Sequence, residues 1–402
     1  MKPCDLSSDV MFEILSRMPL KMLRRCRLLS RECNSLTYES SFMRLHCQRT
    51  NTIAGYFIQT SKKSRGYSTF CSIDNPGVAS DQLTLDFLPE TVHIRATADQ
   101  GLMLCESQRS QNRYYVCKPS TRQWETIPNP NPRYFTCKTA MLVIGSDPLR
   151  FKLVRLSDPE PKEPELESEY SEPELDNYRR YPCEIFDSEI WAWKQLDDVM
   201  LSYDEFFDLG HAISAYGGLH WLTSTGDKKN ILSFNEDKES WESVSLPESF
   251  CHGDHCYHVN LAEYEGKLAL IYQRPEIPLL ELWVMKDYYG KLWSKKHTVN
   301  LADFCKENGF YSAYTLYNAD MIFIQGYYTV IFYNFKNGQF DRLRLPSTHM
   351  FSESAFFFQT DYEPIILRQP REKLSMPHCY STLIFMLFLL FVPLLISFTL
   401  GI

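Results

Sequence analysis

The densest group of side chains that could do chemistry is Cys251-His252-Gly253-Asp254-His255-Cys256-Tyr257-His258. Its thiols and imidazoles are groups that zinc prefers as ligands. The paired Cys-x2-Cys spacing typical of structural zinc sites is missing, however. The stretch also follows a predicted strand that ends at Pro247, where a polar loop is expected. A zinc site and an ordinary loop are therefore the two interpretations, and the loop explains the spacing without a metal.

No other short motif in the chain indicates catalysis. The sequence has no glycine-rich phosphate loop, no nucleophile elbow and no His-Glu-x-x-His pair. Thirteen cysteines are scattered along the chain and no apolar signal sequence opens it, so a reducing cytosolic or nuclear setting is expected. We predict no catalytic residue, no cofactor and no metal, although sites assembled from several loops leave no short motif.

The formal charge of −8 is concentrated in one segment, residues 158–176, which holds nine acidic residues and one lysine. Four prolines interrupt this segment, so we predict a disordered insert that bulges between the first and second clear repeats described below. It is either a solvated insertion or a contact for a basic client. The remainder is nearly neutral, which gives no case for nucleic-acid binding. The basic residues Arg24, Arg25, Arg27 and Arg31 are most simply the solvated faces of helices.

An internal repeat organises most of the chain and must position any site. Its marks are large aromatic residues whose separations are 69, 48, 52 and 47 residues. Removing the 19-residue insert from the first separation leaves 50, which is the length of a propeller blade. The five marks are Trp124, Trp193, Trp241, Trp293 and Phe340.

Other positions keep the same register. An apolar or aromatic residue precedes each mark by seven residues, or by eight before Trp293, with turn-prone residues between, so each pair is predicted to form a hairpin. Adding residues 53–89 as one more unit predicts a mainly β protein with a propeller of about six blades. A last strand must close the ring, because an open sheet edge invites aggregation. Either residues 355–358 or residues 364–367 could supply that strand.

The first residues are predicted to form three short helices. Met11, Ile14 and Leu15 share one face of a first helix, which a serine at its start can cap. Pro19 ends this helix and suits the beginning of the next. A third helix is expected at about residues 30–38. So small a unit buries little apolar surface, so another domain or chain is expected to cover some of its leucines.

This helical run resembles an F-box. Ser7 and Cys33 depart from the usual pattern, where Pro and Trp are common. The positions that match are Leu6, Asp9, Glu13, Ile14, Leu15, Met18, Pro19, Leu20, Leu23, Leu29, Arg31, Leu36 and Phe42.

The repeats resemble the kelch-like, F-box-associated propeller of plant F-box proteins. The resemblance rests on residues 116–124, residues 217–222 and residues 280–285 followed by residues 293–295. It implies domains at residues 1–47 and 51–369.

The resemblance also implies a function. The F-box would recruit a Skp-family adaptor and, through it, a cullin-RING ubiquitin ligase of the SCF type, while the propeller would hold a client protein for ubiquitination. The chain itself would then not be an enzyme. A carbohydrate-binding or oxidase-like propeller is the alternative. The residues expected to contact the adaptor are Leu6, Ile14, Leu15, Pro19, Leu20, Leu23, Leu29, Cys33 and Leu36.

The C-terminal segment, residues 380–402, carries no charge and consists mainly of leucine, phenylalanine and isoleucine. As a helix it would be about 34 Å long, enough to span the hydrocarbon of a membrane. Arg368, Arg371 and Lys373 precede it, and basic residues beside a span tend to stay cytosolic. We therefore predict an apolar helix that is either a transmembrane tail anchor, with the rest of the chain facing the cytosol, or an extension folded onto the propeller.

Overall fold

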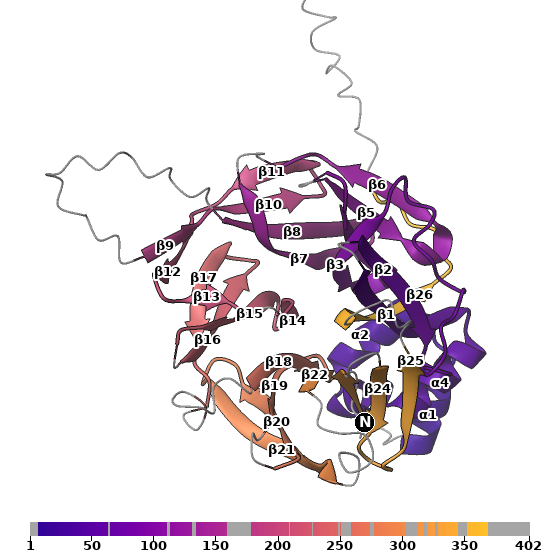
Figure 1. Cartoon of the computed structure of the whole chain (residues 1–402). Coiled ribbons are helices and arrows are strands. Elements are labelled where there is room, and N and C mark those ends of the chain that lie inside the picture. The colour runs from indigo at the N-terminus through magenta and orange to yellow at the C-terminus, as the bar shows by residue number, and fades with distance from the viewer. Residues whose placement is uncertain are drawn as a thin grey trace, which may run out of the picture. The chain divides into compact units, whose positions relative to one another are not determined.

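A computed structural model gives the structure of the protein (Figure 1). It describes residues 7–62, 65–110, 113–130, 134–158, 178–208, 210–226, 228–247, 250, 259–273, 277–302, 312–316, 320–325, 329–344 and 352–368. The cysteine- and histidine-rich stretch at 251–258, the acidic insert beyond Asp158 and the predicted apolar helix at 380–402 lie outside these residues. Within the described ranges, no helix is long and apolar enough to cross a membrane.

Four helices begin the chain, one more than the sequence predicted. They are α1 Ser8–Leu15, α2 Leu20–Leu29, α3 Arg31–Thr37 and α4 Ser40–Arg49. The Ser7 hydroxyl caps α1 by accepting a hydrogen bond from the Val10 amide. The three predicted helices do not include α4, although Phe42, Met43 and His46 form a buried face with helical spacing. We call these four helices the helical module.

The helical module has a small core of its own. Leu15, Leu23 and Phe42 are almost completely buried in it. The buried His46 ring closes one side, where its Nε2 lies 2.8 Å from the Met18 carbonyl oxygen and therefore donates to it. All four helices therefore contribute side chains to this core, and their outer faces stay exposed.

The rest of the described chain forms a ring of six blades (Figure 1). We number the blades from the N-terminal side. Blade 1 contains β1 Thr52–Lys62, β2 Arg65–Ser72 and β26 Ser352–Asp361. Blade 2 contains β3 Val92–Ala98, β4 Leu102–Ser107, β5 Tyr114–Lys118 and β6 Gln123–Ile127, with 3₁₀ turns η1 Asp99–Gly101 and η2 Pro119–Thr121. Blade 3 contains β7 Phe135–Ser146, β8 Leu149–Asp158, β10 Cys183–Asp187 and β11 Ala192–Gln195.

The second half of the ring repeats this plan. Blade 4 contains β13 Phe206–Phe207, β14 Ile213–Ala215, β15 Gly218–Ser224, β16 Lys229–Asn235 and β17 Ser240–Val244. Blade 5 contains β18 Val259–Tyr264, β19 Lys267–Gln273, β20 Leu279–Asp287 and β21 Leu292–Asn300. Blade 6 contains β22 Ser312–Leu316, β23 Met321–Gln325, β24 Thr329–Asn334 and β25 Phe340–Arg344. A separate two-stranded ribbon, β9 Tyr178–Tyr181 with β12 Val199–Ser202, lies beside blade 3.

The hairpin register predicted from the repeat is confirmed in every blade that carries a mark. Each marking aromatic lies directly opposite the residue seven or eight positions before it. The pairs are Cys117 with Trp124, Phe186 with Trp193, Phe234 with Trp241, Met285 with Trp293 and Tyr333 with Phe340.

The turns of these hairpins share one backbone conformation. The residue two positions before each mark has a positive φ, and at only one of the five is it a glycine. A left-handed residue at this point lets a short turn reverse the chain and keeps the outer strand in register. These residues are Arg122, Trp191, Glu239, Lys291 and Gly338.

The C-terminal strand β26 closes the ring. It pairs with β1 from Thr52 opposite Asp361 to Thr60 opposite Ser352. Of the two predicted closing segments, residues 355–358 therefore form the closing strand. The other segment packs along blade 2, where the Gln123 side chain bonds the amide and carbonyl of Ile365.

The acidic insert has a different position from the one predicted. It leaves β8 at Asp158 and returns at Tyr178 in β9. Since β8 already belongs to blade 3, the insert lies within this blade and does not join two blades. The prediction was wrong because β7 and β8 carry no marking aromatic, so the repeat pattern does not assign them to a blade.

Candidate functional site

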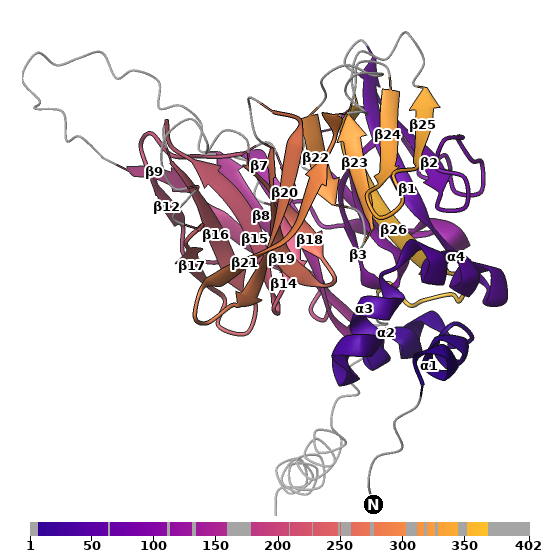
Figure 2. The same cartoon turned by 90° about the horizontal axis from the view of Figure 1, so that it is seen from below.

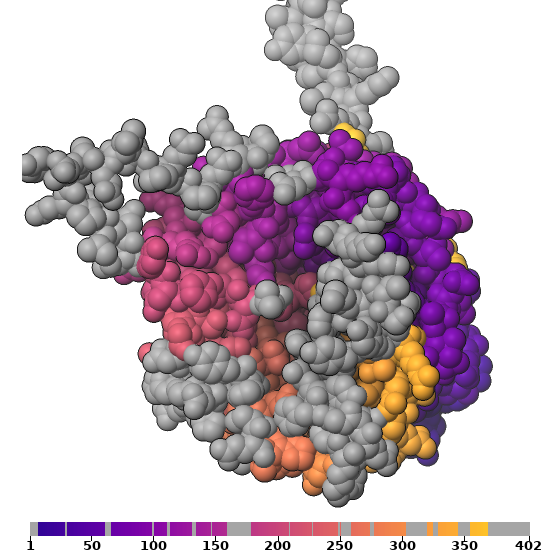
Figure 3. Space-filling view, in the orientation of Figure 1, coloured from indigo at the N-terminus to yellow at the C-terminus, as the bar shows by residue number. Residues whose placement is uncertain are grey.

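A cavity of about 2010 Å³ opens along the middle of the ring. Residues from all six blades line it, and residues of α2 and α3 line it as well. Figure 2 shows these helices on one face of the propeller, and Figure 3 shows the hollowed ring from the other face. Small-molecule pockets usually have volumes of roughly 300–1,000 Å³, so the volume of this cavity exceeds that of a site for one small ligand.

The helical module is fixed against three blades around the cavity. The Lys21 ammonium pairs with Asp147 of blade 3 at 2.8 Å, and this hydrogen bond lowers the pKa of the Asp147 carboxyl. The Ser35 hydroxyl donates to the Glu265 carboxylate of blade 5 at 2.8 Å. The Ser40 hydroxyl donates to Asp320 of blade 6 at 2.6 Å, and both side chains are buried. Contacts on three sides hold the module in one orientation.

Close packing at blade 5 adds to these polar contacts. The turn between β18 and β19 places Gly266 at φ +73° beneath Tyr38 of the module. A Cβ at this glycine would lie 3.1 Å from the Tyr38 hydroxyl oxygen. The Asn34 amide also donates to the carbonyl oxygen of Glu265 at 2.9 Å. The turn therefore packs closely against the C-terminal part of α3.

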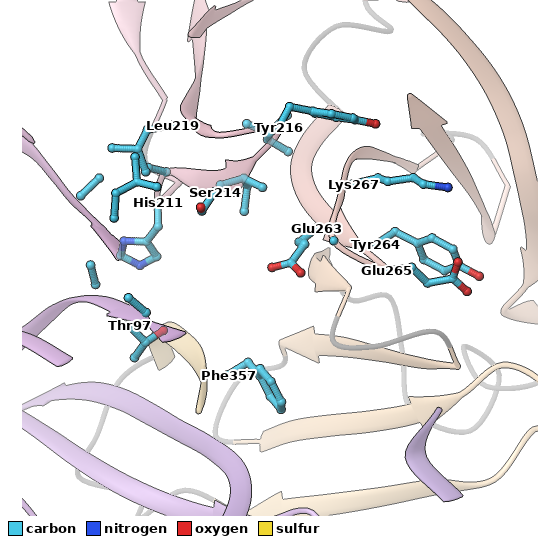
Figure 4. A pocket seen from close by; sticks show the side chains of 18 of the residues that line it. Thr97, His211, Ser214, Tyr216, Leu219, Glu263, Tyr264, Glu265, Lys267 and Phe357 are labelled. Atoms are coloured by element: carbon cyan, nitrogen blue, oxygen red, sulfur yellow. The ribbon is translucent and has the colours of Figure 1, made fainter. Parts of the chain in front are cut away.

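The polar groups inside the cavity are spread over different blades. Figure 4 shows Thr97, His211 and Glu263 around its wall at separate places. The His211 ring faces the cavity and lies 4.5 Å from the Phe356 ring. Crowding by protein atoms lowers its pKa to about 4, with a further contribution from Lys138 and Arg95, so it is neutral at pH 7. On the described part of the wall, these polar side chains therefore lie apart from one another.

Metal binding finds no support in the described ranges, where no group of three or more His, Cys, Asp or Glu side chains is arranged to hold an ion. The candidate zinc ligands at 251–258 fall in a stretch that is not described.

The residues predicted to contact an adaptor fall into distinct groups. Leu15, Leu20 and Leu23 are at most 3% exposed, so they support the module from inside. Cys33 and Leu36 are half-buried against the same core. The side chains of Leu6 and Leu29 are not described.

Two of the predicted residues lie on the surface, Ile14 and Pro19. Ile14 is 44% exposed, and so is Val10, which precedes it by one helical turn. Together they form an exposed apolar face on α1. Figure 2 shows α1 on the side of the module away from the blades. Helical periodicity predicted one apolar face of α1 that includes Ile14 and Leu15 but not Val10. Periodicity alone does not show which side of such a face is buried and which side is exposed.

The marking aromatics have structural roles in part of the ring. The indole N–H of Trp193 donates to the Pro128 carbonyl of blade 2 at 2.6 Å, and that of Trp293 donates to the Ser245 carbonyl of blade 4 at 3.0 Å. Both tryptophans therefore link neighbouring blades. Trp124 and Phe340 differ, since they are 38% and 39% exposed on the outer strands.

Comparison with known proteins identifies both parts. A model of the F-box associated beta propeller domain matches residues 49–363, and a model of the F-box domain matches residues 3–45. The F-box protein At5g41720 of Arabidopsis thaliana is 38% identical over 164 residues, which cover 38% of this chain and 87% of the relative. The F-box protein At5g49610 of the same plant is 26% identical over 311 residues, which cover 73% of this chain and 78% of the relative.

Among solved structures, TolB from Acinetobacter baumannii is similar with a TM-score of 0.44 and 11% sequence identity, covering 82% of this chain and 73% of that one.

Proposed function

The chain belongs to the F-box proteins that carry an F-box-associated β-propeller, and from this we propose that it is a substrate receptor of an SCF-type ubiquitin ligase. F-box proteins generally act as adaptors that bring substrates to such ligases. In this proposal, the helical module binds a Skp-family adaptor, and the adaptor binds the cullin. The propeller binds a client protein. The chain performs no chemistry itself and raises the local concentration of the client near the ligase.

One observation supports the docking role most directly. The helical module already has a buried core, and yet α1 presents Val10 and Ile14 to solvent at 44% exposure each. Neighbouring apolar side chains on the outer face of a small module indicate an interaction surface. We therefore assign the adaptor contact to this outer face, to which Pro19 also belongs as an exposed residue between α1 and α2. The buried leucines shape the surface without touching the partner.

Co-purification with a recombinant Skp-family adaptor tests this assignment. The double variant Val10→Asp, Ile14→Asp places two charges in an interface that would otherwise be dry, so we expect affinity to fall at least tenfold, or about 1.4 kcal/mol. Its thermal midpoint should stay close to the parent's, because both side chains are exposed.

A matched control is Ile190→Asp, an isoleucine that is 60% exposed on blade 3. This control should bind the adaptor as the parent does. Undiminished co-purification of the double variant would refute the assignment of the surface.

A carbohydrate-binding or oxidase-like propeller is the alternative function. A glycan array and metal analysis of the purified full-length protein distinguish it from a substrate receptor. The membrane anchor proposed for residues 380–402 rests on the sequence alone. It would place an otherwise cytosolic or nuclear-facing receptor on a membrane surface.

A further inference from the structure

We propose that the helical module also forms one wall of the client site, where α2 and the start of α3 bind an acidic peptide segment of the client. This inference rests on the proposed receptor function and names the chemistry that the receptor recognises. The residues that carry it are Arg25, Leu28 and Arg31, all of which line the central cavity.

The periodicity of α2 produces this wall. Lys21, Arg25 and Leu28 follow one another at i, i+4 and i+7, so they lie along one stripe of the helix. All three line the cavity. Leu20 and Leu23 are buried on the other side of the same helix. Packing of the leucines inside the module therefore turns the basic stripe toward the ring.

The charge of the cavity differs in sign from that of the whole chain. The described lining contains nine Lys or Arg residues and three Asp or Glu residues. The chain as a whole has a formal charge of −8. Like charges gathered around a low-dielectric opening raise the local concentration of an oppositely charged partner. The cavity therefore favours an anionic occupant even though the whole protein is acidic.

Arg25 and Arg31 are the cations of the module best placed to meet such an occupant. Two neighbours are engaged in the fold, since Lys21 pairs with Asp147 and the guanidinium of Arg27 stacks 4.3 Å above the Tyr38 ring. Arg25 and Arg31 are exposed at the cavity. Guanidinium groups can bind carboxylates through two parallel hydrogen bonds, which suits them to glutamate and aspartate side chains.

Leu28 indicates that the occupant has apolar side chains as well. It is 89% exposed and lies between these two arginines in the sequence. An apolar side chain flanked by cations matches a peptide in which leucine or phenylalanine alternates with acidic residues. The volume of the cavity fits an extended peptide better than a single small anion. We therefore favour an acidic peptide over nucleic acid, whose phosphates would make no use of Leu28.

Fluorescence anisotropy with the full-length protein tests the proposal. The probe is a short fluorescein-labelled peptide of alternating glutamate and leucine, and a peptide with glutamine in place of glutamate serves as the neutral probe. We expect the acidic probe to bind, the neutral probe to bind at least tenfold more weakly, and added salt to weaken the acidic complex. Arg25→Glu with Arg31→Glu should weaken the acidic complex at least tenfold, and Leu28→Ser should weaken both probes.

The matched control is Arg342→Glu with Arg344→Glu, which makes the same change in charge at two exposed arginines of β25 outside the cavity lining. This control should bind the acidic probe as the parent does. Equal loss in both double variants would overturn the proposal, and so would tighter binding of a single-stranded RNA of similar charge.

Adaptor co-purification separates this inference from the proposed function. The Arg25→Glu, Arg31→Glu variant should retain the adaptor. Loss of the adaptor in this variant would assign the two arginines to the docking surface and overturn the inference, while the receptor function would stand. Intact adaptor binding with unchanged peptide binding would also overturn the inference and leave the receptor function untouched.

Discussion

Closure of the ring by β26 leads to a prediction about Phe358. Its side chain is 1% exposed and lies between blades 1 and 2, with its ring centroid 5.4 Å from that of Phe57. Replacing a fully buried phenylalanine by alanine removes apolar contacts and leaves a cavity, so Phe358→Ala should lower the free energy of unfolding by about 3 to 5 kcal/mol. Urea unfolding followed by tryptophan fluorescence measures this loss, with the Phe358→Ala midpoint compared with the parent's.

The neighbouring Phe357 supplies the control. Successive side chains of a strand point to opposite faces, and Phe357 faces the central cavity, where it is only half-buried (Figure 4). Phe357→Ala should therefore cost about half as much as Phe358→Ala or less. Equal losses would contradict the register of β26 against β1, in which Phe358 lies opposite Gly55. A loss below about 1 kcal/mol at Phe358 would mean that this strand does not hold the ring closed.

Two further predictions concern pH and the C-terminal segment. Burial lowers the pKa of His220 to about 4, whereas an unfolded histidine titrates near pH 6.5, so the unfolded chain binds more protons and stability falls as pH decreases through this window. The parent should lose about 2 kcal/mol more than His220→Gln between pH 7 and pH 5 in urea unfolding, and equal losses would contradict the burial of this ring. Alkaline carbonate should leave the full-length chain in the membrane fraction and release a chain that ends at Ser375; release of both would refute the tail anchor.

The sequence predicted the ring well because its blades repeat. Side chains alternate along a strand, and a hairpin fixes which residues lie opposite, so the spacing between Phe234 and Trp241 was enough to pair β16 with β17. Closure by β26 could be narrowed only to two segments. Both are apolar, and the choice depends on contacts between residues more than 290 positions apart, such as Phe358 and Gly55, which no local pattern records.

The sites were harder to predict than the fold. Helical periodicity placed Leu15 and Ile14 on one apolar face of α1, but a stripe of this kind has a buried centre and exposed edges. Which edge is exposed depends on the packing of Phe42 against Leu15, and no local sequence pattern records this packing. The arginines of α2 were interpreted as solvated. They are in part exposed, but the surface that they face is the central cavity, and only the tertiary structure brings that surface beside them.

The attachment of the helical module decides whether the two proposed contacts can coexist. Only two residues separate the end of α4 at Arg49 from the start of β1 at Thr52, so no long linker lets the module swing away from the ring. Polar contacts to blades 3, 5 and 6 then fix its orientation. In this orientation α2 lines the cavity, whereas no described residue of α1 does so. An adaptor on α1 and a client against α2 would therefore occupy different faces of one rigid module. Because a stiff connection keeps the distance between two bound partners nearly constant, it restricts the client lysines that a ligase can reach to those at a matching distance.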